Sequence, residues 1–109
     1  MSDGVSDRVS DRVSGGVRII LPGVLREYAE GAGELVVPAG DGEMSLQTVL
    51  DAALLDRPRL AARIRDETGA LRRHVNVFVD GQDVRRLGGL DAAVEVHAVI
   101  HILPSVAGG

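Results

Sequence analysis

The last six residues of the sequence, PSVAGG, contain one group that could take part in chemistry, the carboxylate of Gly109. Beyond Pro104 there is no large side chain, and five extended residues reach about 17 Å. Gly108 and Gly109 lack a Cβ, so another protein can close tightly around their backbone. The residues leading to this carboxylate are small: Val106, Ala107 and Gly108. Such a carboxylate could enter a narrow active site and be activated with ATP. A plain chain end is equally compatible with these residues alone.

The three histidines are the other groups with evident chemical potential. His97 and His101 are four residues apart on a predicted strand, where a rise of about 3.3 Å per residue separates them by about 13 Å. Zinc requires each imidazole nitrogen within about 2.1 Å, so the two cannot share an ion. His74 has no cysteine or paired acid near it in the sequence. We therefore expect no metal site.

Motifs for independent catalysis are also missing from the sequence. There is no G-x-S-x-G, no H-E-x-x-H and no phosphate-binding loop. Ser105 follows Pro104 with no base placed to activate it, and the Gly88–Gly89 pair is typical of a tight turn. We expect neither an activity of its own nor a bound cofactor.

Composition narrows the class of protein. The 109 residues fit one domain, and the formal charge of −4 argues against nucleic acid as a partner. No apolar run is long enough to cross a membrane, and the polar N-terminus is unlike a secretion signal. A cytoplasmic protein is expected. Cysteine is absent and aromatic residues make up only 2%, which predicts a core of Val, Leu, Ile and Ala.

Hydrophobic periodicity predicts the elements that would position the carboxylate. We expect a disordered leader over residues 1–16, a domain over residues 17–104 and a flexible tail over residues 105–109. The predicted elements are strands at 17–21 and 34–38 with a helical turn between them, a helix capped by Ser45, a second helical segment from Pro58 to Gly69, a hairpin at 75–84 and a last strand at 94–103. Asp80 and Gly81 would form the hairpin turn and place Val77 opposite Val84. This order predicts an α+β fold, one main helix packed on a mixed sheet of four to five strands.

The same alternation predicts a partner surface. Phe78 falls on the strand face opposite its valine neighbours, and Val99 and Leu103 face away from Ile100 and Ile102. If the helix covers the Ile100 face, these three side chains form an exposed apolar patch beside the tail. The alternative is that the second helical segment or the leader covers them.

Two stretches, HVNVFVDGQDVRRLGGLDAAV and HILPSVAGG, resemble the ubiquitin-like sulfur carriers of the MoaD/ThiS family. They are most similar to the CysO type, which carries sulfur for thiocarboxylate-dependent cysteine synthesis. The resemblance covers residues 17–109 and is specific from Arg73 onward. It implies a ubiquitin-like β-grasp fold. One departure is EVHAV before the last strand, where the family has a polar turn, so this strand could begin earlier.

The resemblance also implies a mechanism and partners. An E1-like adenylyltransferase of the MoeB, MoeZ or ThiF kind would adenylate the Gly109 carboxylate, using ATP, and a sulfur donor would convert it to a thiocarboxylate. The acceptor would be held by a PLP-dependent, cysteine-synthase-like enzyme, and a JAMM-type zinc metalloprotease would release the product. The alternatives are a small subunit of molybdopterin synthase, a ubiquitin-like protein modifier, and an interaction module with an inert tail.

Overall fold

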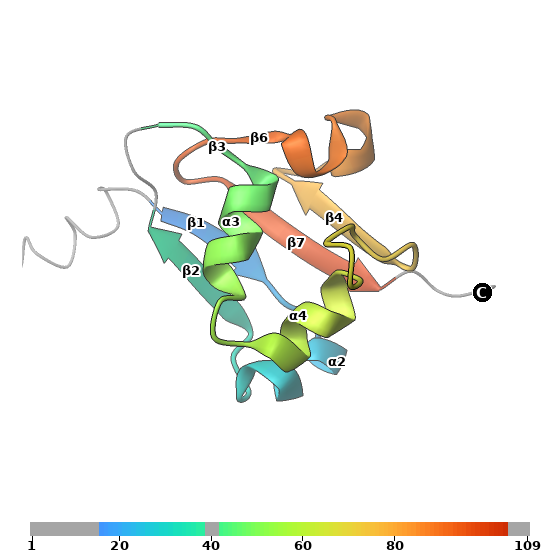
Figure 1. Cartoon of the computed structure of the whole chain (residues 1–109). Coiled ribbons are helices and arrows are strands. Elements are labelled where there is room, and N and C mark those ends of the chain that lie inside the picture. The colour runs from blue at the N-terminus through green and yellow to red at the C-terminus, as the bar shows by residue number, and fades with distance from the viewer. Residues whose placement is uncertain (1–15, 39–41, 105–109) are drawn as a thin grey trace, which may run out of the picture.

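A mixed five-stranded sheet organises the computed structural model, which describes residues 16–38 and 42–104 (Figure 1). The strand order is β2-β1-β7-β4-β5. The central strand β7 runs parallel to β1 and antiparallel to β4. The strands are β1 (Gly16–Ile20), β2 (Glu34–Pro38), β4 (Val75–Val79), β5 (Gln82–Asp83) and β7 (Val99–Pro104). The predicted mixed sheet is confirmed.

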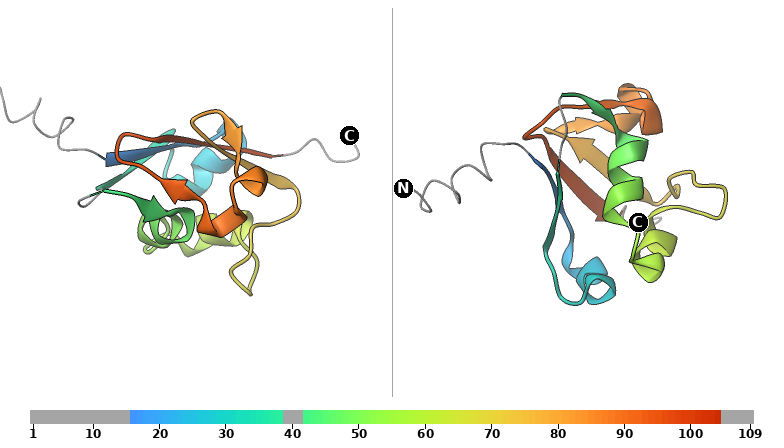
Figure 2. Two further views of the ribbon diagram at one scale, coloured as in Figure 1. Left: turned by 90° about the horizontal axis from the view of Figure 1, so that it is seen from above. Right: turned by 60° about the vertical axis from the view of Figure 1, so that its left-hand side comes forward.

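Helices cover one face of this sheet (Figure 2). They are α2 (Gly23–Arg26) continued by η1 (Glu27–Ala29), then α3 (Leu46–Ala53), α4 (Pro58–Ile64), η2 (Val84–Arg86) and η3 (Gly89–Asp91). A small antiparallel ribbon of β3 (Met44–Ser45) and β6 (Ala93–Val94), which the sequence did not suggest, lies beside the N-terminal end of α3. Within the described residues no helix is long and apolar enough to cross a membrane.

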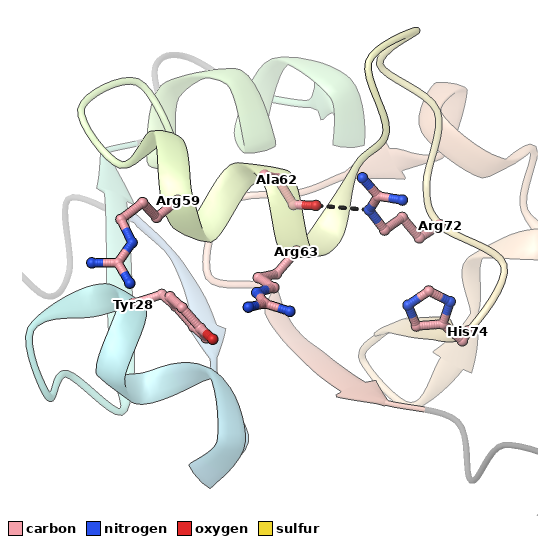
Figure 3. Close-up of a pocket in the computed structure, with 6 residues that line it drawn as sticks. All are labelled: Tyr28, Arg59, Ala62, Arg63, Arg72 and His74. Atoms are coloured by element: carbon pink, nitrogen blue, oxygen red, sulfur yellow. Dashed lines mark hydrogen bonds between the residues drawn. The ribbon is translucent and has the colours of Figure 1, made fainter.

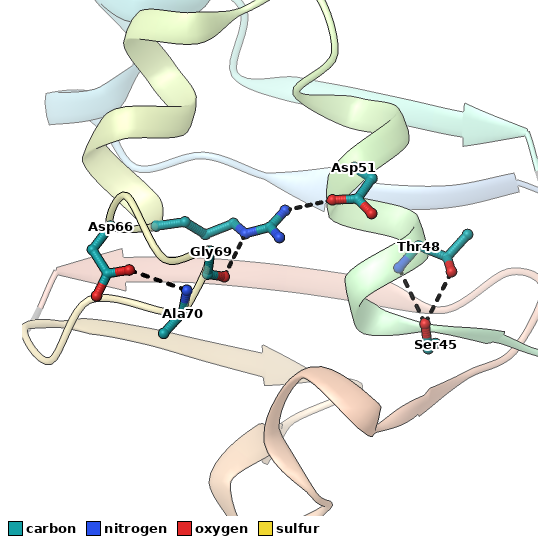
Figure 4. A network of polar contacts seen from close by, with 7 residues as sticks. Ser45, Thr48, Asp51, Asp66, Gly69 and Ala70 are labelled. Carbon is teal, nitrogen blue, oxygen red and sulfur yellow. Dashed lines mark hydrogen bonds and ion pairs between the residues drawn. The ribbon is translucent and has the colours of Figure 1, made fainter.

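The main helix α3 begins and packs as its sequence predicts. The Ser45 hydroxyl accepts a hydrogen bond from the Thr48 amide at 3.1 Å, which satisfies one of the free donors of the first turn (Figure 4). Its buried residues recur at helical spacing and face the sheet; they are Leu46, Val49, Leu50 and Ala53.

The core between helices and sheet is aliphatic. All of the buried side chains among the described residues are Val, Leu, Ile or Ala, and none is polar. In β7 the buried residues are Ile100 and Ile102, and in β4 they are Val75, Val77 and Val79. Because successive side chains of a strand point to opposite faces, the residues between these buried ones lie on the face of the sheet away from the helices.

The second helix is shorter than predicted. It ends at Ile64 rather than near Gly69, because Arg65 has an extended backbone and forms an isolated bridge with Leu71. Gly69 lies inside the intervening loop with a φ of 91°. Asp66 closes this loop, since its Oδ1 accepts from the Thr68 amide at 2.8 Å. It also accepts from the Ala70 amide at 3.2 Å (Figure 4).

The predicted hairpin turn is confirmed, but the predicted pairing beyond it is wrong. Val79 pairs with Gln82 across Asp80 and Gly81. The strand then ends at Asp83, whose Oδ1 accepts from the Arg85 amide at 2.9 Å and caps η2. Val84 therefore does not pair with Val77, although it is buried in the core.

The predicted last strand is two strands separated by a turn. β6 ends at Val94 and β7 begins at Val99. Between them the Ala98 amide donates to the Glu95 carbonyl at 3.1 Å, and His97 adopts a left-handed conformation with a φ of 71°. The stretch EVHAV therefore holds a turn even without Asp or Gly, and the strand does not start earlier. At the other end, β1 includes Gly16, the last residue of the predicted leader; residues 1–15 lie outside the described chain.

Candidate functional site

The sheet face opposite the helices carries an apolar surface. Side chains from four neighbouring strands contribute to it, and none of the described helices covers it (Figure 2). We call it the outer patch; it consists of Ile20, Val36, Phe78, Val99 and Leu103. Val36 is 63% exposed and Leu103 44%, whereas the other three are half-buried among neighbouring side chains.

Strand register places His101 at the middle of the outer patch. His101 pairs with Ile20 of β1 on one side and with Phe78 of β4 on the other. Residues two apart on β7 share a face, so Val99 and Leu103 lie before and after His101 along the strand. The polar imidazole thus stands among apolar side chains on an open surface.

One polar pair lies within the outer patch and another lies beside it, since Arg18 pairs with Val36 of β2 and with Val99 of β7. Next to Val36, Arg18 Nε donates to Glu34 Oε2 at 2.7 Å, and this hydrogen bond lowers the pKa of the Glu34 carboxyl and raises the pKa of Arg18. Beside the patch, Arg85 Nη1 donates to Asn76 Oδ1 at 2.8 Å. Exposed apolar side chains with polar groups among them are typical of a protein-binding surface.

The strand faces predicted from sequence are confirmed for Phe78, Val99 and Leu103. All three lie on the outer face, and the second helical segment lies with α3 on the opposite face. The other predicted site residues, Val106, Ala107, Gly108 and Gly109, lie outside the described residues. The chain reaches them directly from Leu103 and Pro104 at the end of β7 (Figure 1).

The predicted strand geometry of the two histidines is wrong. His97 lies in the turn before β7, so only His101 is on the strand. In residues 16–38 and 42–104 no three His, Cys, Asp or Glu side chains gather in a way that could hold a metal ion.

Sequence reasoning missed a second feature, a groove at the end of the domain where β7 stops. Two adjoining hollows of about 410 and 310 Å³ share Tyr28, Arg63 and His74 in their walls (Figure 3). These residues come from η1, from α4 and from the segment before β4, so no local motif joins them. The one available signal was Tyr28, one of only two aromatic residues.

Comparison with known proteins agrees with this geometry. The model of the ThiS family matches residues 19–109. The sulfur carrier protein CysO of Mycobacterium tuberculosis is 34% identical over 95 residues, which span 85% of this chain and 98% of CysO.

Solved structures show the same fold. The crystal structure of the Amycolatopsis orientalis BexX/CysO complex contains a chain with a TM-score of 0.71 and 33% identity, covering 85% of this chain and 99% of that one. SAMP1 from Haloferax volcanii matches with a TM-score of 0.71 and 28% identity over 87% of this chain and all of its own. With its five-stranded sheet, helix-covered inner face and ubiquitin-like β-grasp neighbours, the chain belongs to the MoaD/ThiS family.

Proposed function

We propose that this protein is a sulfur carrier whose reactive group is the C-terminal carboxylate of Gly109. The observation that carries the proposal is the path of β7. Its outward side chains lie in the outer patch, and the same strand ends at Pro104, five residues before Gly109. Support also comes from the match to CysO, which covers 98% of that sulfur carrier protein, and from the family match that extends to residue 109.

The chemistry takes place on the carboxylate in the active sites of partner enzymes. The carboxylate oxygen attacks the α-phosphate of ATP, releasing pyrophosphate and forming an acyl-adenylate. Hydrosulfide from a sulfur donor then attacks the carbonyl carbon, AMP leaves, and a thiocarboxylate results. An E1-like adenylyltransferase is the proposed activating enzyme. The carrier provides the substrate group, and the partners catalyse.

The domain and the segment after it have separate roles in this proposal. The outer patch binds the activating enzyme, because its exposed apolar side chains provide affinity and the polar groups among them provide specificity. Residues 105–109 then span about 17 Å into the active site. Gly108, Ala107 and Val106 are small enough to pass through a narrow channel, which a longer side chain would block.

Mass spectrometry tests the proposal directly. The full chain is incubated with ATP, an E1-like enzyme and a sulfur source, and replacement of one oxygen by sulfur adds about 16 Da. Deleting Gly109 should abolish this gain without affecting folding. Gly108→Val should reduce it strongly, with Ser105→Ala as a control substitution in the same segment. An unchanged mass with several E1-like enzymes would argue against the proposal.

Cysteine biosynthesis is the proposed destination of the sulfur, with a PLP-dependent, cysteine-synthase-like enzyme as acceptor and a JAMM-type metalloprotease for release. Similarity to the CysO proteins supports it. Binding of the loaded carrier to such a synthase, compared with binding to a large subunit of molybdopterin synthase, separates this role from that of a molybdopterin-synthase small subunit.

A second candidate function is protein modification. It is favoured by the 26–28% identity to SAMP1 of Haloferax volcanii, a small archaeal modifier protein. A modifier would form isopeptide bonds between Gly109 and lysines of other proteins. Detection of such adducts in lysate of the source cells would support this function, whereas thiocarboxylate without adducts supports the carrier alone.

A further inference from the structure

The groove around Tyr28 has a cationic half and an apolar half. The cationic half is lined by Tyr28, Arg59, Arg63, Arg72 and His74, and no carboxylate lines it (Figure 3). The apolar half is lined by Val24, Leu25, Val75, Ile102 and Pro104, together with the three shared residues. We call the two halves together the Tyr28 groove.

The charge of the cationic half is unusual for this chain. The net charge of the whole chain is −4, yet three arginines and a histidine line the same hollow as the Tyr28 ring. The guanidinium carbons of Arg63 and Arg59 lie 4.6 and 5.4 Å from the centre of the Tyr28 ring. Such cation–π contacts orient the two side chains without neutralising them.

None of these arginines is used in an ion pair within the described residues. The ion pairs there join Arg18 to Glu34, Arg65 to Asp51 and Arg85 to Asp83. Arg72 donates from Nε to the Ala62 carbonyl at 2.7 Å, which fixes its position, and its charge helps to lower the pKa of Asp66 without an ion pair between them. The cationic half therefore favours an anion, and a carboxylate matches the guanidinium geometry.

The apolar half adjoins the point where the C-terminal segment begins. Pro104 lines it, and the chain continues from there for five residues with Val106 as the one large apolar side chain. Val24 is 65% exposed at this place although it is apolar. A valine that covers it would remove apolar surface from water. Three extended residues beyond Val106 reach about 10 Å, and Arg63 lines both halves, so the two halves adjoin directly.

We propose that the Tyr28 groove binds the chain's own C-terminal segment, with Val106 in the apolar half and the Gly109 carboxylate between Arg59 and Arg63. A short tether gives the carboxylate an effective concentration in the millimolar range, so a weak intrinsic affinity is sufficient. A thiocarboxylate keeps the negative charge and binds in the same way. The groove thus holds the reactive end against the carrier until a partner enzyme competes for it.

This inference shares one premise with the proposed function, a free carboxylate at Gly109, but it does not depend on sulfur chemistry. The test uses the full ¹⁵N-labelled chain and the same chain with Gly109 converted to its amide, which removes the charge without changing the length. Amide signals of Tyr28, Arg63 and His74 should differ between the two forms. The heteronuclear NOE of Gly108 should be higher in the acid form.

Arginine variants then assign the effect to the groove. In the double variant Arg59→Gln, Arg63→Gln, the difference between acid and amide forms should disappear. Arg86→Gln, which removes an exposed arginine of η2 outside the groove, should leave it unchanged. In the amide form, free acetate should shift the groove signals, and in the acid form it should shift them less because the site is occupied.

Identical groove signals in the acid and amide forms would overturn the proposal, and this comparison needs no substitution that could disturb folding. Groove signals that respond only to an added E1-like enzyme would also overturn it and assign the groove to an acidic partner. The mass assay for the thiocarboxylate is independent of this NMR comparison. If sulfur is loaded but the C-terminal segment does not bind the groove, the carrier function stands and the groove proposal fails. If the segment binds but no sulfur is loaded, the groove proposal stands and the carrier function fails.

Discussion

Asp80 and Val99 are joined by two hydrogen bonds. The Asp80 amide donates to the Val99 carbonyl at 2.9 Å, and the Val99 amide donates to Asp80 Oδ1 at 2.9 Å. Asp80 adopts a φ of 49°, a conformation that short polar side chains tolerate. The turn of the β4–β5 hairpin thus holds the first residue of β7, the strand that leads to the C-terminal segment.

Replacing Asp80 should therefore destabilise the domain. In Asp80→Ala the Val99 amide loses its acceptor and the residue keeps a left-handed backbone, so we expect the free energy of unfolding to fall by about 1–3 kcal/mol. Asp80→Asn retains an oxygen acceptor and tolerates this backbone, so it should lose less. Urea denaturation of the three proteins measures the difference. Equal loss in both variants would show that the side-chain hydrogen bond does not stabilise the strand.

Much of the fold is encoded locally and could be predicted. Alternating valines and isoleucines define the strands and their faces, Ser45 defines the start of α3, and Asp80–Gly81 defines the hairpin turn. These signals are short-range and agree with one another. The outward positions of Phe78, Val99 and Leu103 followed from the same alternation.

Three features could not be predicted from the sequence. They depend on contacts between residues far apart in the chain or on a backbone conformation that no local residue type indicates. His97 takes a left-handed turn without Gly or Asn, so alternation alone extended the strand through it. The early end of α4 depends on the pairing of Arg65 with Leu71. The Tyr28 groove joins η1, α4 and the start of β4, a proximity that only the tertiary structure provides.

The cap of α3 gives a second stability prediction. Ser45→Ala removes the oxygen that accepts from the Thr48 amide, and loss of such a cap costs about 1 kcal/mol. Ser45→Asp supplies another acceptor and serves as the matched control, with stability close to the wild type. Thermal unfolding followed by circular dichroism measures both. A full loss of stability in Ser45→Asp would show that packing at this position, and not the cap, is decisive.

Acid should weaken the loop that holds Arg72 and His74 at the groove. Hydrogen bonds from Thr68, and a further one from the Ala70 amide, lower the pKa of the Asp66 carboxyl below its ordinary value. Because the folded-state pKa lies below the unfolded one, the stabilisation is present above the unfolded pKa. It is lost as the pH falls through the folded-state pKa.

The difference in unfolding free energy between wild type and Asp66→Asn measures this effect, because Asn cannot titrate. The difference should be largest near neutral pH and should shrink as the pH is lowered past the ordinary range of an aspartic acid. Glu34, whose pKa is lowered by Arg18, contributes with the same sign in both proteins and cancels. A difference that is constant with pH would contradict the role of the Asp66 charge.

The last prediction concerns the outer patch as the docking surface for an activating enzyme. Leu103→Asp and Phe78→Asp place a charge within an apolar surface on the uncovered sheet face. Each should weaken binding by about 1–3 kcal/mol, the range typical of a central interface residue. Leu55→Asp is the matched control, because Leu55 is 78% exposed and lies just after α3 on the other side of the domain.

Affinity for an E1-like enzyme, measured by calorimetry, and stability, measured by urea denaturation, must be compared for the same proteins. Leu103 is 44% exposed and Phe78 is half-buried, so Leu103→Asp should lower the free energy of unfolding less than Phe78→Asp does. Reduced affinity in both patch variants with unchanged affinity in Leu55→Asp supports docking through this face. If all three bind equally well, the enzyme does not use the outer patch. If Phe78→Asp unfolds the domain while Leu103→Asp only binds less, Phe78 stabilises the sheet and Leu103 alone reports on the interface.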